Sequence, residues 1–161
     1  MPGAPSGEPL APAFRPPSGW RRLRSRRVEV HDESMAPVLI PGDRLLVDVR
    51  AYLSSPPVVG HIVVLVDPDA AGRWLIKRVA GVGPGRFWRT RGILTAAPEV
   101  PADPVPPPDA IETVTLPGST LYVTGDAPTA RDSLQFGPVP FAALVGRAYY
   151  RYAPFERRGE L

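Results

Sequence analysis

Short apolar runs, rather than helical periods, dominate the hydrophobic pattern of this chain. β-Branched and apolar residues gather between Gly, Pro and Asp breakers, which is typical of strands. These runs predict strands at residues 44–49, 61–66, 74–79, 111–116, 121–124 and 148–152. A short helical turn is predicted at 141–145. The pattern therefore predicts a mainly β protein, built as an antiparallel sheet or barrel.

Composition divides the chain into one folded domain with less regular ends. The 161 residues, 43% of them apolar, suffice for one domain with a core. Residues 1–19 are crowded with Pro, Gly and Ala and lack an apolar period, so they predict a disordered tail. A basic segment at 20–27, the folded domain at 28–153 and a C-terminal tail at 154–161 follow. The proline-dense stretch 98–108 predicts a surface loop inside the domain.

Several classes of site are excluded or disfavoured by what the chain lacks. It has no cysteine, so disulfides, zinc–thiolate sites and a cysteine nucleophile are excluded. With two histidines and no HExxH spacing, a zinc hydrolase is poorly supported, and we expect no metal. No apolar run approaches the roughly 20 residues of a transmembrane helix. We therefore expect no membrane span, and a protein that is cytoplasmic or peripherally associated with the plasma membrane.

The basic segment holds five arginines between Trp20 and Arg27, in a chain of net charge +3. Together with Trp20 and Leu23, they could dock on anionic lipid, each basic residue adding about 1 kcal/mol. They could also neutralise nucleic-acid phosphates, but no helix-turn-helix precedes the domain and no aromatic residues are interleaved with them. A solvated stretch leading into the first strand is the third reading. Membrane contact stays open, and nucleic-acid binding is not expected.

The sharpest local pattern is the segment Ser34-Met35-Ala36-Pro37-Val38-Leu39-Ile40-Pro41-Gly42-Asp43. It places a small hydroxyl just before a proline-stiffened turn, where the side chain can stay exposed on rigid backbone. A nucleophile needs such a position, although an ordinary surface serine in a turn would look the same. Ser34 is therefore a candidate nucleophile that requires a base.

Lys77 is the candidate base. Side chains alternate faces along a strand, so Leu75, Lys77 and Val79 share one side of the predicted strand. If that side faces the core, burial disfavours the charged amine and can lower its pKa by about 3–5 units from about 10.4. A neutral lysine can then take a serine proton, as in Ser-Lys variants of the catalytic triad. A solvated lysine on an edge strand is the alternative.

A third element begins with the predicted strand Leu121 to Thr124, which ends in the Gly125-Asp126 turn. The polar run Arg131-Asp132-Ser133 and the segment Phe136 to Pro140 follow it. Such a turn and loop can hold active-site residues in position by packing against them and hydrogen bonding to them. An ordinary turn-rich connection has the same composition.

In this order, the three elements resemble the type I signal peptidases, a family of Ser/Lys serine peptidases. The shared motifs are SMxPxLxxGD, a Lys-Arg pair in an apolar strand, then GD, DS and FGxVP. The resemblance runs from about Val28 to Tyr152 and is closest to soluble members without an anchor, similar to the nickel superoxide dismutase maturation proteases. It implies a coiled antiparallel β-sheet, barrel-like as in LexA-type domains, with a small β insertion at 86–117.

The resemblance also implies a function and roles for residues. The chain would be a serine endopeptidase that removes an N-terminal signal or leader segment from precursor proteins, without a cofactor. Ser34 would be the nucleophile, Lys77 the general base, and the Ser34 backbone N–H part of the oxyanion hole, while Met35 and Pro37 shape the turn. A supporting set would comprise Arg78, Gly125, Asp126, Thr129, Asp132 and Ser133. The precursor would bind as an added β-strand, with small residues before the scissile bond.

Four positions depart from the family pattern. Asp32 stands where relatives place a Ser or Gly at the oxyanion hole, and His61 replaces the Asp of a Gly-Asp pair. Ala130 stands where a serine orients the lysine, so Thr129 would have to replace it, and Leu134 removes an arginine partner of Asp132.

These departures leave alternative functions open. The chain could be a protease dedicated to one precursor, such as nickel superoxide dismutase. It could also be a degenerate member that binds lipid or nucleic acid. A Ser-His-Asp hydrolase using His31 or His61 is a further rival, although no GxSxG elbow is present.

Overall fold

The computed structural model describes residues 25–90, 93–97 and 105–161. The predicted tail at 1–19, residues 20–24 of the basic segment and most of the proline-dense stretch lie outside the described residues. The strands are β1 (Ser25–Glu29), β2 (Arg44–Asp48), β3 (Ile62–Val66), β4 (Trp74–Val82), β5 (Gly85–Thr90), β6 (Ile93–Ala96), β7 (Glu112–Leu116), β8 (Thr120–Thr124), β9 (Val139–Pro140), β10 (Leu144–Ala153) and β11 (Gly159–Glu160). One short helix, α1 (Ser133–Phe136), and 3-10 turns at Phe141–Ala143 and Phe155–Arg157 complete the described elements.

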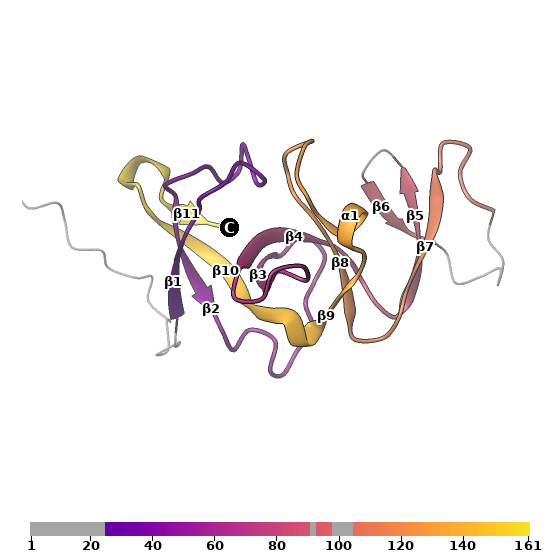
Figure 1. Cartoon of the computed structure of the whole chain (residues 1–161), viewed down its shortest axis with the longest axis horizontal. Coiled ribbons are helices and arrows are strands. Elements are labelled where there is room, and N and C mark those ends of the chain that lie inside the picture. Colours follow the sequence, from indigo (N-terminus) through magenta and orange to yellow (C-terminus); the bar gives the residue numbers. More distant parts are fainter. Residues whose placement is uncertain (1–24, 91–92, 98–104) are drawn as a thin grey trace, which may run out of the picture.

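The strands form two antiparallel sheets, so the predicted mainly β, coiled antiparallel fold is confirmed. The larger sheet runs β1-β2-β10-β3-β4-β8-β9, with β11 paired to β10, and it curls into a half-barrel. The smaller sheet, β6-β5-β7, lies at the opposite end of the molecule from β1 and β2 (Figure 1). Its strands fall within the predicted insertion, residues 86–117, apart from the first residue of β5.

β3 is covered on both faces, which explains its continuous apolar run. Ile62 and Val64 belong to a core with Met35 and Leu45 under the loop between β1 and β2. Val63 and Leu65 belong to a second core formed by β4, β8 and β9. A strand buried on both faces reads as an unbroken apolar run rather than an alternating one. β3 therefore joins the two cores of the half-barrel.

The segment 154–161, which the sequence indicates as a tail, folds back onto the large sheet. β11 pairs with β10, and Leu161 packs against the first core. Arg157 donates from Nε to Asp43 Oδ1 at 2.9 Å, and Arg151 donates to Asp43 Oδ2 at 3.1 Å. Both arginines also donate to the Val38 carbonyl. This set of contacts, called the C-terminal clamp below, fastens the end of the chain to the loop that carries Ser34.

Replacing Asp43 with alanine is expected to lower the free energy of unfolding by about 3 kcal/mol. The Asp43 side chain is fully buried, and its loss removes the acceptor for two arginines and for the Ile40 N–H. Glu29→Ala is the matched control, because its ion pair with Arg44 is exposed and such pairs contribute less than about 1 kcal/mol. Urea unfolding of both variants measures the difference. Equal losses would show that the C-terminal clamp does not stabilise the fold.

Candidate active site

Ser34 lies in the loop between β1 and β2, on backbone that is fastened from below. Met35 and Leu39, its neighbours in the loop, are fully buried in the first core. The loop closes on itself through hydrogen bonds from Leu39 N–H to the Met35 carbonyl at 2.8 Å and from Ala36 N–H to the Glu33 carbonyl at 2.9 Å. Ser34 itself is only half-buried. The structure thus places Ser34 on rigid backbone, as the sequence predicts, with the buried Met35 as its anchor and Pro37 at the surface.

Lys77 lies in β4 on the buried face of the sheet. Leu75, Lys77 and Val79 are all buried, and Lys77 is only 2% exposed, so the predicted alternation is confirmed. Burial lowers the pKa of Lys77 below its ordinary value of 10.5. The negative charges of Asp32 and Asp132 oppose this shift, and the charge of Arg131 reinforces it. The amine is therefore biased toward the neutral form that can accept a proton.

Ser34 and Lys77 line the same cleft, of about 550 Å³. Thr129, Ala130 and Arg131 line it from the loop between β8 and α1. The structure thus brings together the two residues predicted as nucleophile and base, and it also brings Thr129 to the cleft. Of the two histidines, only His31 is among the residues lining the cleft, while the His61 Nδ1 lies 3.0 Å from the Tyr52 hydroxyl.

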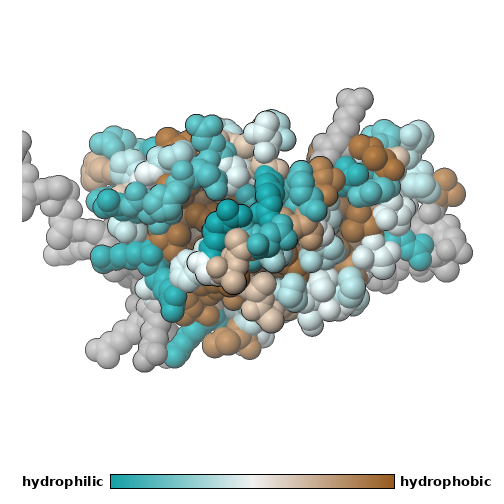
Figure 2. All heavy atoms as spheres, in the orientation of Figure 1, coloured by the Kyte–Doolittle hydropathy of each residue, from teal (hydrophilic) through white to brown (hydrophobic). Residues whose placement is uncertain are grey.

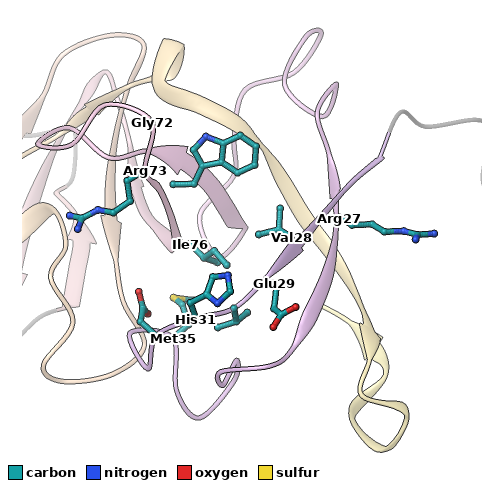
Figure 3. Close-up of a pocket in the computed structure, with 11 residues that line it drawn as sticks. Arg27, Val28, Glu29, His31, Met35, Gly72, Arg73 and Ile76 are labelled. Atoms are coloured by element: carbon teal, nitrogen blue, oxygen red, sulfur yellow. The ribbon is translucent and has the colours of Figure 1, made fainter.

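A groove of about 410 Å³ continues from the cleft between two strand edges. Residues 27–32 form one side and residues 72–76 the other, and four residues, His31, Asp32, Arg73 and Trp74, line both the cleft and the groove. Figure 3 shows Ile76 and Met35 close to His31 within the groove, whereas Arg27 points away from it. Apolar side chains form part of the floor, namely those of Val28, Val30, Met35, Trp74 and Ile76. Figure 2 shows apolar surface between hydrophilic side chains on the face of the molecule that it presents.

Both edges of the groove are open in the part of the chain that the structure describes. β1 is the terminal strand of its sheet, and β4 pairs with β8 only from Arg78 onward. Backbone groups of residues 74–77 are therefore available on the side away from β3. An extended peptide could pair with such edges while its side chains occupy the apolar floor.

The loop after β8 packs directly against Ser34. A Cβ atom at Gly125 would lie 2.5 Å from the Ser34 carbonyl oxygen and 2.1 Å from the Ala130 Cβ, so only glycine fits there. The Ala127 N–H donates to the same Ser34 carbonyl at 3.1 Å. The Gly125 N–H in turn donates to Asp132 at 3.0 Å. These contacts support the predicted role of Gly125 and Asp132 behind the nucleophile.

The remaining predicted supporting residues tie this loop to the sheet. Arg78 donates to both carboxylate oxygens of Asp126, at 2.8 and 2.6 Å, and to the Gly60 carbonyl. The buried Ser133 hydroxyl accepts the Val123 N–H at 2.9 Å. In the absence of an arginine at position 134, Asp132 forms the N-cap of α1 and accepts the Leu134 N–H. Asp132 therefore has local partners in place of the arginine.

An ionic cluster that the sequence analysis did not single out includes two arginines of the cleft lining, Arg73 and Arg131. Arg131 donates to both oxygens of the buried Asp67, each at 3.2 Å, and also pairs with Asp69. Arg73 donates to the same Asp67. Burial raises the pKa of Asp67, but hydrogen bonds from Asp69, Arg131 and Arg73 lower it to about 2. The cluster locks the turn between β3 and β4 to the loop that follows β8.

Asp32, which the sequence shows only as a departure from the family pattern, contacts Ser34 directly. Its Oδ1 accepts the Ser34 backbone N–H at 2.8 Å, which is the group predicted to belong to the oxyanion hole. Partial burial raises the pKa of Asp32, but hydrogen bonds from Ser34 and the charge of Lys77 outweigh it and leave that pKa below its usual value of 3.8. Asp32 is therefore ionised at neutral pH and is turned toward the nucleophile. The Asp-x-Ser spacing, typical of turns in which Asp accepts the N–H two residues later, is the sequence signal for this contact.

Sequence comparisons place the chain among known peptidases. The family model "Signal peptidase, peptidase S26" matches residues 21–153. A mitochondrial ATP-independent inner membrane protease subunit 1b of Arabidopsis thaliana is 34% identical over 130 residues, covering 80% of this chain and 70% of the relative. A signal peptidase I of Leptolyngbya laminosa is 32% identical over 155 residues, covering 89% and 76%. A probable signal peptidase I-1 of Synechocystis sp. is 30% identical over 144 residues, covering 82% and 73%.

Within the described residues, none of the helices has the length and apolar character needed to cross a bilayer. The matched region contains the Ser34 loop, β4 with Lys77 and the loop after β8. It therefore includes every residue predicted for the site. The chain belongs to the signal peptidase family, peptidase S26, and is a serine-type peptidase.

Proposed function

We propose that this chain is an endopeptidase with a Ser34/Lys77 dyad, and that it removes an N-terminal signal or leader segment from precursor proteins through an acyl-enzyme. The observation that carries the proposal is the burial of Lys77, with its lowered pKa, in the cleft that Ser34 also lines. A lysine that loses its proton more readily than usual, in the same cleft as a serine on rigid backbone, suits the roles of general base and nucleophile.

The chemistry needs only these two side chains and a water molecule. The neutral Lys77 amine takes the proton from the Ser34 hydroxyl as Oγ attacks the carbonyl carbon of the scissile bond. The resulting lysine ammonium then protonates the departing amine, which breaks the C–N bond and leaves an ester on Ser34. Water, deprotonated by the same lysine, hydrolyses that ester and regenerates the enzyme.

The groove supports binding of the precursor in an extended form. A peptide strand lying between residues 27–32 and 72–76 would use the open backbone edges for hydrogen bonds. Val28, Met35 and Ile76 line the groove and would contact its side chains. Apolar walls of limited volume suit small or aliphatic side chains before the scissile bond. Relatives named as signal peptidase I support a signal-bearing precursor as the substrate.

Trapping the acyl-enzyme tests the proposal directly. The protein is mixed with a peptide ester carrying small residues before the ester carbonyl, quenched in acid and measured by intact mass. A covalent adduct that maps to Ser34 is expected in the wild type and in Ser54→Ala, which replaces an exposed serine outside the cleft lining. If the ester is hydrolysed but the trapped acyl group maps to another residue and never to Ser34, the proposed acyl-enzyme on Ser34 is contradicted.

The pH dependence of peptide cleavage is expected to show a limb set by Lys77. The rate of cleavage should rise with pH as Lys77 loses its proton, and the limb should lie below pH 10.5 because burial lowers the pKa of this amine. Values of kcat/KM, obtained from initial cleavage rates between pH 5 and pH 10, measure this limb. The rival His31 mechanism predicts instead that the limb disappears in His31→Ala, which would reassign the base.

A further inference from the structure

The backbone N–H of the proposed nucleophile is already occupied. In the structure, Asp32 Oδ1 lies 2.8 Å from the Ser34 nitrogen and accepts its hydrogen bond. Asp32 lines both the cleft and the adjoining groove, so its carboxylate lies where a substrate would have to pass. Its side chain is exposed, so it can leave this position without opening the core.

This contact is incompatible with acyl transfer at Ser34. The tetrahedral intermediate puts a negative charge on the former carbonyl oxygen, which needs hydrogen-bond donors at about 2.7–3.1 Å. An ionised carboxylate donates no hydrogen bond, and it would compete with the developing oxyanion for the same N–H. Two negative oxygens close together also repel one another. The Asp32 carboxylate must therefore move away before the reaction can proceed.

The charges around Asp32 favour the blocked arrangement. Lys77 on β4 attracts the carboxylate, and His31 adds a weaker contribution of the same sign. Arg73 from the turn between β3 and β4 and Arg131 from the loop after β8 line the same cleft. The opposing negative groups are Glu33 in the cleft lining, and Asp132 and Asp67, whose charges reach Lys77. The same Asp32 charge raises the pKa of Lys77 and so favours its protonated form.

We propose that Asp32 is an autoinhibitory group, whose carboxylate holds the Ser34 N–H in the free enzyme until the carbonyl oxygen of a bound substrate replaces it. The inference rests on the proposed Ser34/Lys77 chemistry. Free enzyme is in this way kept from attacking weakly bound peptides. Only a segment that fills the groove binds tightly enough to displace a charge-assisted hydrogen bond. Asp32 thereby favours cleavage of substrates that pair along the whole groove over cleavage of shorter ones.

Three variants separate this role from a purely structural turn. Asp32→Ala removes the blocking group altogether. Asp32→Asn removes its charge but keeps an oxygen that can accept the Ser34 N–H and preserve the turn. Asp109→Asn is the matched control, because it removes the same charge from an exposed residue outside the linings of the cleft and the groove. A thermal unfolding curve for each variant checks that it is folded.

Cleavage of a short peptide that fills little of the groove is the decisive assay. Asp32→Ala should raise kcat/KM for that peptide by about tenfold, a rate change equivalent to about 1.4 kcal/mol in the barrier. Asp32→Asn should give a smaller rise, and Asp109→Asn should change kcat/KM by less than about twofold. Both Asp32 variants should also shift the Lys77 limb of the pH profile to lower pH, and Asp109→Asn should not. A long precursor should gain less than the short peptide.

The amide resonance of Ser34 provides a readout that does not depend on turnover. In the wild type, its proton shift should follow a carboxylate that titrates below the ordinary aspartate range, and this titration should vanish in Asp32→Asn. Folded Asp32 variants with unchanged or reduced kcat/KM would overturn the autoinhibitory role while leaving the dyad intact. A Ser34→Ala protein as active as the wild type would instead overturn the proposed function, and the inference with it. If the wild type and all variants, including Asp32→Ala, cleave no peptide, both the proposed function and the autoinhibitory role of Asp32 are overturned.

Discussion

Replacing Ser34 with alanine should lower kcat/KM for peptide cleavage by about 10³-fold or more, without unfolding the protein. Loss of the hydroxyl removes the only atom that can form the acyl-enzyme in the proposed chemistry, and losing one member of such a catalytic unit costs nearly the full effect. The fold should survive, because Ser34 contributes its backbone carbonyl, not its side chain, to the contact with Ala127. Initial cleavage rates and a thermal melt measure the two effects.

Serines elsewhere serve as controls for this substitution. Ser54→Ala changes an exposed serine and should leave both cleavage and stability unaltered. Ser133→Ala removes the buried acceptor of the Val123 N–H, so it should reduce stability by about 1–3 kcal/mol. A Ser34→Ala enzyme that kept a tenth of the wild-type rate would exclude this hydroxyl as the nucleophile.

Replacing Lys77 with methionine should likewise lower kcat/KM by about 10³-fold or more, but it should stabilise the protein at neutral pH. Burial lowers the pKa of Lys77 in the folded state, so the unfolded chain binds more protons between the folded pKa and 10.5. Below that window, the buried amine therefore costs stability, and stability rises with pH across it. Methionine has a similar length and carries no charge, so it removes this cost.

The comparison with Lys77→Arg sharpens the result. An arginine cannot lose its proton at accessible pH, so this variant should be both inactive and less stable than the wild type. The stability gained by Lys77→Met should also shrink as the pH approaches 10.5. Urea midpoints at several pH values check both expectations. A methionine variant less stable than the wild type at neutral pH would show that Lys77 acts chiefly as an ion-pair partner of nearby carboxylates.

Much of the fold could be predicted from the sequence, because strand signals are local. The apolar run of β3 and the alternation of β4 reflect burial against direct neighbours, and both strands agree with the predicted ranges to within a few residues. The expected helical turn at 141–145 is only partly correct. A 3-10 turn ends at Ala143, and Leu144 already begins β10, which pairs with β2 and β3. Pairing with distant strands overrides weak local preference there.

The candidate site also contains residues that local sequence predicts and residues that it does not. Ser34 and Lys77 could be predicted because each stands in a recognisable local pattern. Arg131 and Asp67, by contrast, are 64 residues apart, and nothing local to either indicates the other. Their pairing depends on the register of β3 against β4 and on the path of the loop after β8. The sequence shows that such charges are present, whereas the fold decides which of them meet.

The C-terminal clamp has a consequence for the order in which the enzyme matures during synthesis. Asp43 is separated from Arg151 by 108 residues and from Arg157 by 114. At about 5–20 residues per second, the ribosome takes on the order of 10 s to add the arginine that fastens the loop of Ser34. Until then the loop that carries Ser34, the proposed nucleophile, lacks these contacts. We therefore expect proteolytic competence to appear only when translation of the domain is almost finished, which protects neighbouring nascent chains from an enzyme still being made.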